Sequence, residues 1–115
     1  MAKNQSTEDY IKAIFKLQQH GKGVSTSELA NHLNIGDGSV TGMLKKLSAK
    51  KLIRYRPYKG VVLAEPGRKL ALQMIRRHRL WEMFLVEHLG YRWDEIHDEA
   101  ERLEHVTSDE MERRL

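Results

Sequence analysis

The 115-residue sequence predicts a mainly α-helical protein. Apolar side chains recur at three- and four-residue spacing through most of the chain, which is the pattern of helices that bury one face. Only one short stretch, residues 52–63, alternates as a pair of strands would. The length allows one compact domain, or one domain with a short appended helical segment.

The composition excludes several classes of protein. Hydrophobic residues make up 40% of the chain, and no run approaches the roughly 20 apolar residues of a membrane-spanning helix. The start, MAKNQSTEDY, has no apolar targeting core, so we expect a cytoplasmic protein that does not engage a membrane. Cysteine is absent, which excludes disulfides, thiolate metal sites and cysteine nucleophiles.

Charge is distributed unevenly along the chain. Residues 1–60 carry eleven Lys and Arg against four Asp and Glu, whereas residues 61–115 carry nine against twelve. Residues 39–60 contain seven basic side chains and no acidic one. One half therefore suits a polyanion and the other suits a cation. Because a charge run is also what an ordinary solvated surface presents, the local structure must decide between these interpretations.

The first element expected is a helix that begins at Ser6 or Thr7 and is ended by Gly21 and Gly23. Serine and threonine side chains cap helix starts, and glycine favours the turn that ends them. The side chains expected to face inward are Tyr10, Ile11, Ile14, Phe15 and Leu17.

A helix-turn-helix pattern follows. Ser25 and Glu28 have the spacing of a capping box at the start of a short second helix. Residues 34–38, Asn-Ile-Gly-Asp-Gly, have the composition of a turn, and residues 39–50 are expected to form a third, basic helix. A short helix, a glycine-bearing turn and a basic helix in succession are typical of DNA-binding helix-turn-helix units.

A basic hairpin after this unit would be a wing. Residues 52–58 alternate, Lys59-Gly60 can turn the chain, and residues 61–63 return. We therefore predict that residues 1–65 form a winged helix-turn-helix DNA-binding domain. Its third helix would enter the major groove of double-stranded DNA, and its wing would reach phosphates. The side chains expected at DNA are those of Ser25, Thr26, Gly36, Asp37, Gly38, Ser39, Thr41, Gly42, Lys45, Lys46, Arg54, Arg56 and Lys59.

Residues 36–42 are small, so shape and phosphate contacts should matter more than paired hydrogen bonds to bases. A winged helix used only for protein contacts is the alternative, and the uncompensated basic charge counts against it.

Residues 66–115 are predicted to form a helical segment that serves dimerisation. Pro66 suits the first position of a long helix that runs to about Leu89, where Gly90 breaks it. A further helix is expected over residues 93–106, and Ser108 would cap a last one. The long helix has an apolar stripe wider than a small core needs, which predicts a homodimer surface. The stripe comprises Leu70, Met74, Ile75, Leu80, Trp81, Phe84 and Leu85.

The same segment carries a candidate metal site. His97, Glu101, Glu104 and His105 are spaced so that a helix would place them on one face, and His78 and Glu82 are one turn apart on the long helix. Imidazole and carboxylate groups bind divalent ions such as Mn²⁺, Fe²⁺, Co²⁺ or Zn²⁺. The alternative is a surface salt-bridge network in which these acids pair with arginines, namely Arg76, Arg77, Arg79 and Arg102.

The whole chain resembles the diphtheria-toxin-repressor family of metal-dependent transcriptional regulators, in particular its manganese-transport regulators. The resemblance rests on Thr7-Glu-Asp-Tyr10, Ser39-Val-Thr41, Arg77-His-Arg-Leu-Trp-Glu82 and above all His97-Asp-Glu-Ala-Glu-Arg-Leu-Glu-His-Val106 followed by Ser108-Asp-Glu-Met-Glu-Arg-Arg-Leu115. It implies a winged-helix dimer that binds a palindromic operator when metal is present and usually represses metal-uptake genes.

The resemblance also implies two metal sites. His78, Glu82 and His97 match the ancillary site of the family, and the regulatory site is matched by Asp9, Glu101, Glu104 and His105. Iron-responsive members typically have Met and Cys where this chain has Asp9 and Glu101, so the carboxylates favour Mn²⁺, with Fe²⁺ as the alternative. Some manganese regulators have another acid at the position of Lys12, so separate sites are expected rather than a two-ion cluster.

Two other functions are alternatives to this one. A winged-helix regulator controlled by a small organic ligand would leave the His/Glu face unexplained, and it predicts DNA binding that is indifferent to chelator. A metal-dependent hydrolase is disfavoured because the sequence has no His-Glu-x-x-His motif and no serine-nucleophile elbow, so we expect no enzyme.

Overall fold

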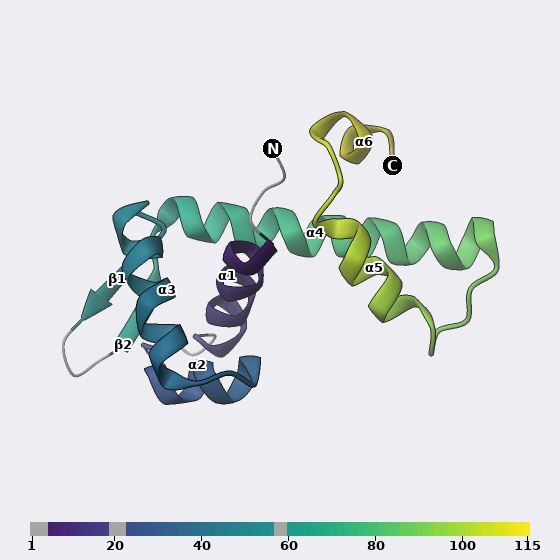
Figure 1. Cartoon of the computed structure of the whole chain (residues 1–115). Helices are drawn as coiled ribbons and strands as arrows, with labels where there is room; N and C mark the ends of the chain where they lie inside the picture. Colours follow the sequence, from purple (N-terminus) through teal and green to yellow (C-terminus); the bar gives the residue numbers. More distant parts are fainter. Residues whose placement is uncertain (1–4, 19–22, 57–59) are drawn as a thin grey trace. The chain divides into compact units, whose positions relative to one another are not determined.

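The computed structural model describes residues 5–18, 23–56 and 60–115 (Figure 1). It contains two compact units, one of Ser6–Ala71 and the other with Leu72–Leu115 as its main part. The units divide inside a long helix, six residues beyond the boundary predicted after residue 65. The division into compact units does not show which residues bind DNA and which serve dimerisation. The functional boundary after residue 65 therefore stays a prediction.

The first unit is a winged helix-turn-helix, as predicted. Its elements are α1 (Gln5–Leu17), α2 (Thr26–Leu33), α3 (Asp37–Ala49), β1 (Ile53–Arg56), β2 (Gly60–Leu63) and the first turns of α4 (Glu65–Leu89). Each element contributes apolar side chains to one core, which is why a unit this small can be stable. The fully buried side chains include Ile11, Ile14, Leu29, Val40, Leu47 and Val61.

The first helix differs from its prediction at both ends. It begins at Gln5, so Ser6 and Thr7 lie within its first turn and do not cap it. It ends at Leu17, and the Oε1 atom of Gln18 accepts a 2.9 Å hydrogen bond from the Leu63 amide, which ties this end of α1 to β2. Gly23 lies in the loop that follows, and Gly21 lies outside the described residues.

The helix-turn-helix is built by local capping. Ser25 Oγ accepts from the Glu28 amide and Glu28 Oε1 accepts from the Ser25 amide, both at 3.0 Å, which confirms the capping box. Asn34 ends α2 in the left-handed conformation with φ 58°. The predicted start of α3 at Ser39 was wrong: Gly36 is the N-cap, and the helix begins at Asp37. An acidic side chain is stabilised in the first turn of a helix, where the dipole is positive.

The wing is an antiparallel hairpin in which Ile53 pairs with Leu63 and Tyr55 pairs with Val61. An isolated bridge, with two 2.8 Å hydrogen bonds between Val24 and Val61, joins the hairpin to the loop before α2. Gly60 has φ +89°, and a Cβ atom there would lie 2.5 Å from the carbonyl oxygen of Val24. Only glycine fits this backbone conformation at this distance.

The second unit contains the rest of α4, α5 (Ile96–Glu104) and α6 (Asp109–Arg114). Gly90, at φ +73°, follows the end of α4 as predicted. The helix predicted over residues 93–106 is shorter at both ends. Residues 93–95 form a turn in which the Glu95 amide donates to the Arg92 carbonyl at 2.9 Å, and α5 begins after this turn.

Polar contacts attach α6 to α4. The guanidinium of Arg77, whose side chain is 5% exposed, donates to Asp109 at 2.8 Å and to Glu112 at 2.6 Å. Ser108 Oγ accepts from the Met111 amide at 3.0 Å, which confirms the predicted cap. In the predicted apolar stripe of α4, Met74 and Leu85 are buried within the single chain, so a partner cannot reach them. Among the described residues, no helix has the length and apolar character needed to cross a membrane.

Candidate metal centre and DNA-binding face

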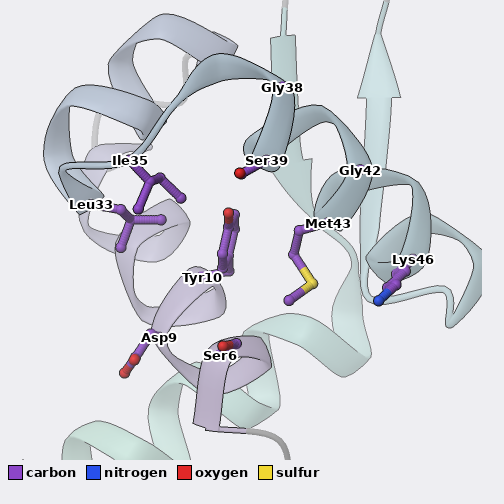
Figure 2. A pocket seen from close by; sticks show the side chains of 10 residues that line it. All are labelled: Ser6, Asp9, Tyr10, Leu33, Ile35, Gly38, Ser39, Gly42, Met43 and Lys46. Atoms are coloured by element: carbon purple, nitrogen blue, oxygen red, sulfur yellow. The ribbon is translucent and has the colours of Figure 1, made fainter.

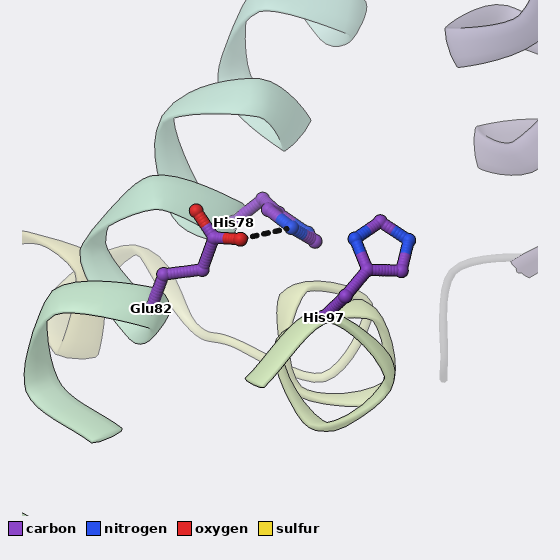
Figure 3. A group of neighbouring side chains, drawn as sticks. All are labelled: His78, Glu82 and His97. Carbon is purple, nitrogen blue, oxygen red and sulfur yellow. Dashed lines mark hydrogen bonds and ion pairs between the residues drawn. The ribbon is translucent and has the colours of Figure 1, made fainter. Parts of the chain in front are cut away.

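The first group of candidate ligands joins α4 to α5 (Figure 3). His78 and Glu82 are one turn apart on α4, and His78 Nε2 lies 3.1 Å from Glu82 Oε2. His97 approaches from α5, with its ring centroid 5.0 Å from that of His78. One ligand atom from each of the three residues lies within 4.8 Å of the others, which is close enough for one divalent ion.

A second group shares His78. Glu104, whose side chain is fully buried, places Oε1 2.7 Å from His78 Nδ1. Glu101 completes this group, again with one ligand atom per residue within 4.8 Å. His78 therefore directs one ring nitrogen towards each group.

His105 extends the second group. Its side chain is 3% exposed, and Nε2 lies 3.3 Å from Glu101 Oε2 and 3.5 Å from Glu104 Oε2. His105 is the C-cap of α5 rather than a residue inside the helix, but its backbone angles, φ −80° and ψ −15°, remain in the helical region. The four residues predicted on one face of α5 thus divide: His97 belongs to the first group, Glu101 and Glu104 belong to the second, and His105 contacts both of these carboxylates.

The arginines near these acids have other partners. Arg102 donates to Glu99 at 2.6 Å, and this hydrogen bond raises the pKa of the Arg102 guanidinium. Arg77 holds Asp109 and Glu112, and Arg76 lies 3.0 Å from Glu112. The ion pairs of Arg76, Arg77 and Arg102 therefore join these arginines to acids other than the candidate ligands, which differs from the salt-bridge network predicted as the alternative.

The remaining candidate ligand, Asp9, lies on α1 in the first unit. It lines a cleft of about 510 Å³ between α1 and the start of α3 (Figure 2). Tyr10 also lines this cleft, with its hydroxyl directed towards α3, and burial raises the pKa of that hydroxyl. A role for Asp9 in metal binding stays a prediction.

The side chains predicted to face DNA lie mostly on the surface. Ser39, Thr41, Lys45 and Lys46 are exposed on α3, and a Cβ atom added at Gly36, Gly38 or Gly42 would meet nothing within 4 Å. Small exposed residues of this kind allow a close approach of the helix to another surface. Thr26 is half-buried, and Ser25 is exposed but uses its hydroxyl in the capping box. Arg54 and Arg56 are exposed on β1, whereas Lys59 lies outside the described residues.

Both parts of the chain match descriptions of one family. Residues 4–61 match "Iron dependent repressor, N-terminal DNA binding domain", and residues 64–115 match "Iron dependent repressor, metal binding and dimerisation domain".

Curated relatives agree with this match. The chain is 39% identical over 113 residues to an HTH-type transcriptional regulator of Methanocaldococcus jannaschii, covering 97% of this chain and 90% of the relative. It is 36% identical over 110 residues to the iron-dependent repressor IdeR of Mycobacterium tuberculosis, covering 96% of this chain and 48% of IdeR. The chain spans about half the length of IdeR and of the diphtheria toxin repressors of Corynebacterium glutamicum and Corynebacterium jeikeium.

Solved structures are similar in fold and sequence. A manganese-dependent transcriptional repressor in complex with manganese has a TM-score of 0.81 and 43% identity, over 94% of this chain and 50% of that one. The repressor ScaR with bound Zn²⁺ has a TM-score of 0.84 and 41% identity, over the same shares of the two chains.

Proposed function

Because the chain belongs to the iron-dependent repressor family, as its motifs predicted, we propose that it is a transcriptional repressor whose DNA binding is activated by a divalent metal ion. The observation that carries this proposal is the convergence of imidazole and carboxylate groups around His78 in a chain that also contains a basic winged-helix unit. The relatives named above are described as iron- or manganese-dependent repressors. We assign the chain a binding function and no catalytic one.

Two metal sites are proposed. His78, Glu82 and His97 would hold one ion, and Asp9, Glu101, Glu104 and His105 would hold the regulatory one. These donors are oxygen and imidazole nitrogen, without sulfur, which favours Mn²⁺, with Fe²⁺ as the alternative. The burial of Glu104 supports this assignment, because a buried carboxylate is stabilised by a charge of opposite sign, and the buried His105 places a ring nitrogen 3.5 Å from it.

The ion would supply positive charge among crowded carboxylates, and its ligands would connect the DNA-binding unit to the metal-binding unit. Asp9 belongs to the DNA-binding unit, and the other proposed ligands belong to the metal-binding unit. An ion bound by both would restrict the angle between the two units, so that a cytoplasmic homodimer presents two recognition helices at the spacing of a palindromic operator. Repression of metal-uptake genes would follow.

The test is a DNA-binding titration against a library of palindromic duplexes, at fixed salt, with chelator, Mn²⁺, anaerobic Fe²⁺ or Zn²⁺. Salt must stay constant because phosphate contacts make affinity steeply salt-dependent. We expect Mn²⁺ or Fe²⁺ to raise affinity by about tenfold or more, a coupling of at least ~1.4 kcal/mol. Equal affinity in chelator would support control by an organic ligand and overturn the metal switch.

Asp9→Ala tests whether Asp9 couples metal binding to DNA binding, separately from metal binding at the other site. This variant should still bind an ion at His78, Glu82 and His97, as measured by calorimetry, but Mn²⁺ should no longer raise its affinity for DNA. Asp37→Ala is the control, because Asp37 is an exposed acid of the same unit and is itself proposed to face DNA. Glu8 is unsuitable for this purpose because its side chain is buried. Asp37→Ala should alter DNA affinity equally with and without metal.

A further inference from the structure

The wing presents different side chains on its two faces. Because paired residues of an antiparallel hairpin share a face, Tyr55 lies with Ile53, Val61 and Leu63, and Arg54 and Arg56 lie on the other face. Ile53 and Val61 are buried in the core of the first unit. The face of β1 that adjoins α3 therefore carries Tyr55, and both arginines point away from it.

Tyr55 borders a cleft of about 340 Å³ between β1, α3 and the start of α2. The apolar part of its lining comes from Leu44 and Ile53, which are buried. Its polar part comes from Thr26, Thr41, Lys45, Ser48 and Tyr55. The Thr41 hydroxyl donates to the Asp37 carbonyl at 3.1 Å, which leaves three hydroxyls and one ammonium as the donors around the cleft.

These groups match one kind of ligand. Hydroxyl and ammonium donors suit phosphate oxygens, and an apolar surface beside them suits the hydrocarbon part of deoxyribose. The arrangement offers no carboxylate or amide side chain, which are the groups that read adenine or cytosine edges. Tyr55 is 62% exposed, so its ring and its hydroxyl are both accessible to a ligand.

We propose that Tyr55, with Lys45, Ser48 and Thr26, binds one sugar–phosphate unit of the DNA backbone in each half-site. This inference rests on the proposed DNA-binding function and adds a residue that the charge pattern of the wing does not reveal. Tyr55 fixes the register of α3 on the duplex through a contact that is independent of base sequence. Arg54 and Arg56 act at a different part of the backbone, because they extend from the opposite face of β1.

The test uses the full chain with saturating Mn²⁺ and a duplex selected in the titration above. Tyr55→Phe removes one hydroxyl per subunit and keeps the ring, so it should weaken DNA binding by roughly three- to tenfold for each half-site, the effect of one hydrogen bond. Each phosphate of the duplex is then replaced in turn by an uncharged methylphosphonate. At one phosphate per half-site, the affinity lost on methylphosphonate substitution should be at least about threefold smaller in Tyr55→Phe than in the unaltered protein. The reason is that both changes remove the same contact.

Matched variants make the outcome decisive. Lys45→Met should lower the slope of log affinity against log salt by about 1 per half-site, or about 2 per dimer, whereas Tyr55→Phe should leave that slope unchanged. Tyr91→Phe, in the other unit, should not alter DNA binding. The inference is overturned if the free-energy losses from Tyr55→Phe and from the methylphosphonate are additive at every phosphate. It is also overturned if the affinity lost in Tyr55→Phe depends on the base sequence of the duplex. If no duplex is bound under any metal condition, the proposed function fails as well.

Discussion

Glu104 and His78 are joined directly: the Oε1 atom of Glu104 lies 2.7 Å from His78 Nδ1, although the two residues come from different helices and Glu104 is fully buried. A buried carboxylate is costly unless cations or donors surround it. Glu104 has His78 on one oxygen and His105 at 3.5 Å on the other. It therefore connects the two groups of candidate ligands.

Glu104→Gln should weaken metal binding at both groups by at least about tenfold, because the amide keeps the shape of the side chain but loses the charge that the ion and both imidazoles require. Calorimetric titration with Mn²⁺ measures the effect. Glu99→Gln is the matched control, since Glu99 lies on the same helix and pairs with Arg102. Unchanged Mn²⁺ affinity in Glu104→Gln would contradict the assignment.

Arg77→Met should detach α6 from α4. The substitution leaves Glu112, whose side chain is 15% exposed, without its 2.6 Å partner. We expect the free energy of unfolding in urea to fall by about 2 kcal/mol, because the partly buried carboxylate loses its nearer, buried counter-charge and keeps only the exposed Arg76 at 3.0 Å. Arg113→Met removes an exposed pair with Glu110 and should cost less than about 0.5 kcal/mol. Equal effects for the two variants would show that Arg77 does not anchor α6.

Gly60→Ala should destabilise the wing. A Cβ atom there would lie 2.5 Å from the Val24 carbonyl oxygen, in a backbone conformation with φ +89°. We expect a loss of about 2 kcal/mol or more in the free energy of unfolding, measured by thermal denaturation. Gly42→Ala is the control for stability: its Cβ would meet nothing within 4 Å in a helix, so it should be neutral or stabilising. A stable Gly60→Ala protein would show that the wing can shift away from Val24.

Thr107→Val should leave the indole of Trp81 without its acceptor. Thr107 Oγ1 accepts from Trp81 Nε1 at 2.8 Å and donates to the Leu103 carbonyl at 2.6 Å. The loss of both bonds from a buried hydroxyl should cost about 1–3 kcal/mol. Trp93→Phe removes the only other tryptophan, so fluorescence then reports the Trp81 environment alone. An unchanged unfolding midpoint and emission maximum would argue against this bond.

Local patterns predicted much of the fold. The capping box at Ser25 and Glu28, the break at Gly90 and the cap at Ser108 all depend on residues within a few positions, and all are confirmed. The errors lay at helix starts that no capping side chain marks. A turn closed by the Glu95 amide and the Arg92 carbonyl precedes α5, and α3 begins at Asp37 after Gly36, an N-cap without a side chain.

The candidate site was predicted less completely. Helical spacing brought His78 near Glu82 and gathered the acids of α5, but spacing along one helix is silent about contacts between helices. The approach of His97 and Glu104 to His78 depends on how α4 and α5 pack around Leu85, Ile96 and Ala100. Tyr55 was not among the predicted DNA-facing residues, because the prediction for the wing rested on its basic side chains. Strand alternation from the buried Ile53 was the signal that places it beside α3.

A neutral imidazole carries one proton, and this limits how the two ligand groups around His78 can be filled. When Nδ1 holds the proton and donates it to Glu104, only Nε2 has a lone pair for an ion beside Glu82. An ion bound at Nδ1 requires the other tautomer, with Nε2–H donated to Glu82. A neutral His78 can therefore bind an ion at Nε2 or at Nδ1 but not at both, and donation from Nδ1 to Glu104 leaves the ring set for the ion proposed beside Glu82 and His97. Nitrogen-15 chemical shifts of the His78 ring would distinguish the two forms, and a single tautomer at every metal level would show that only one side is used.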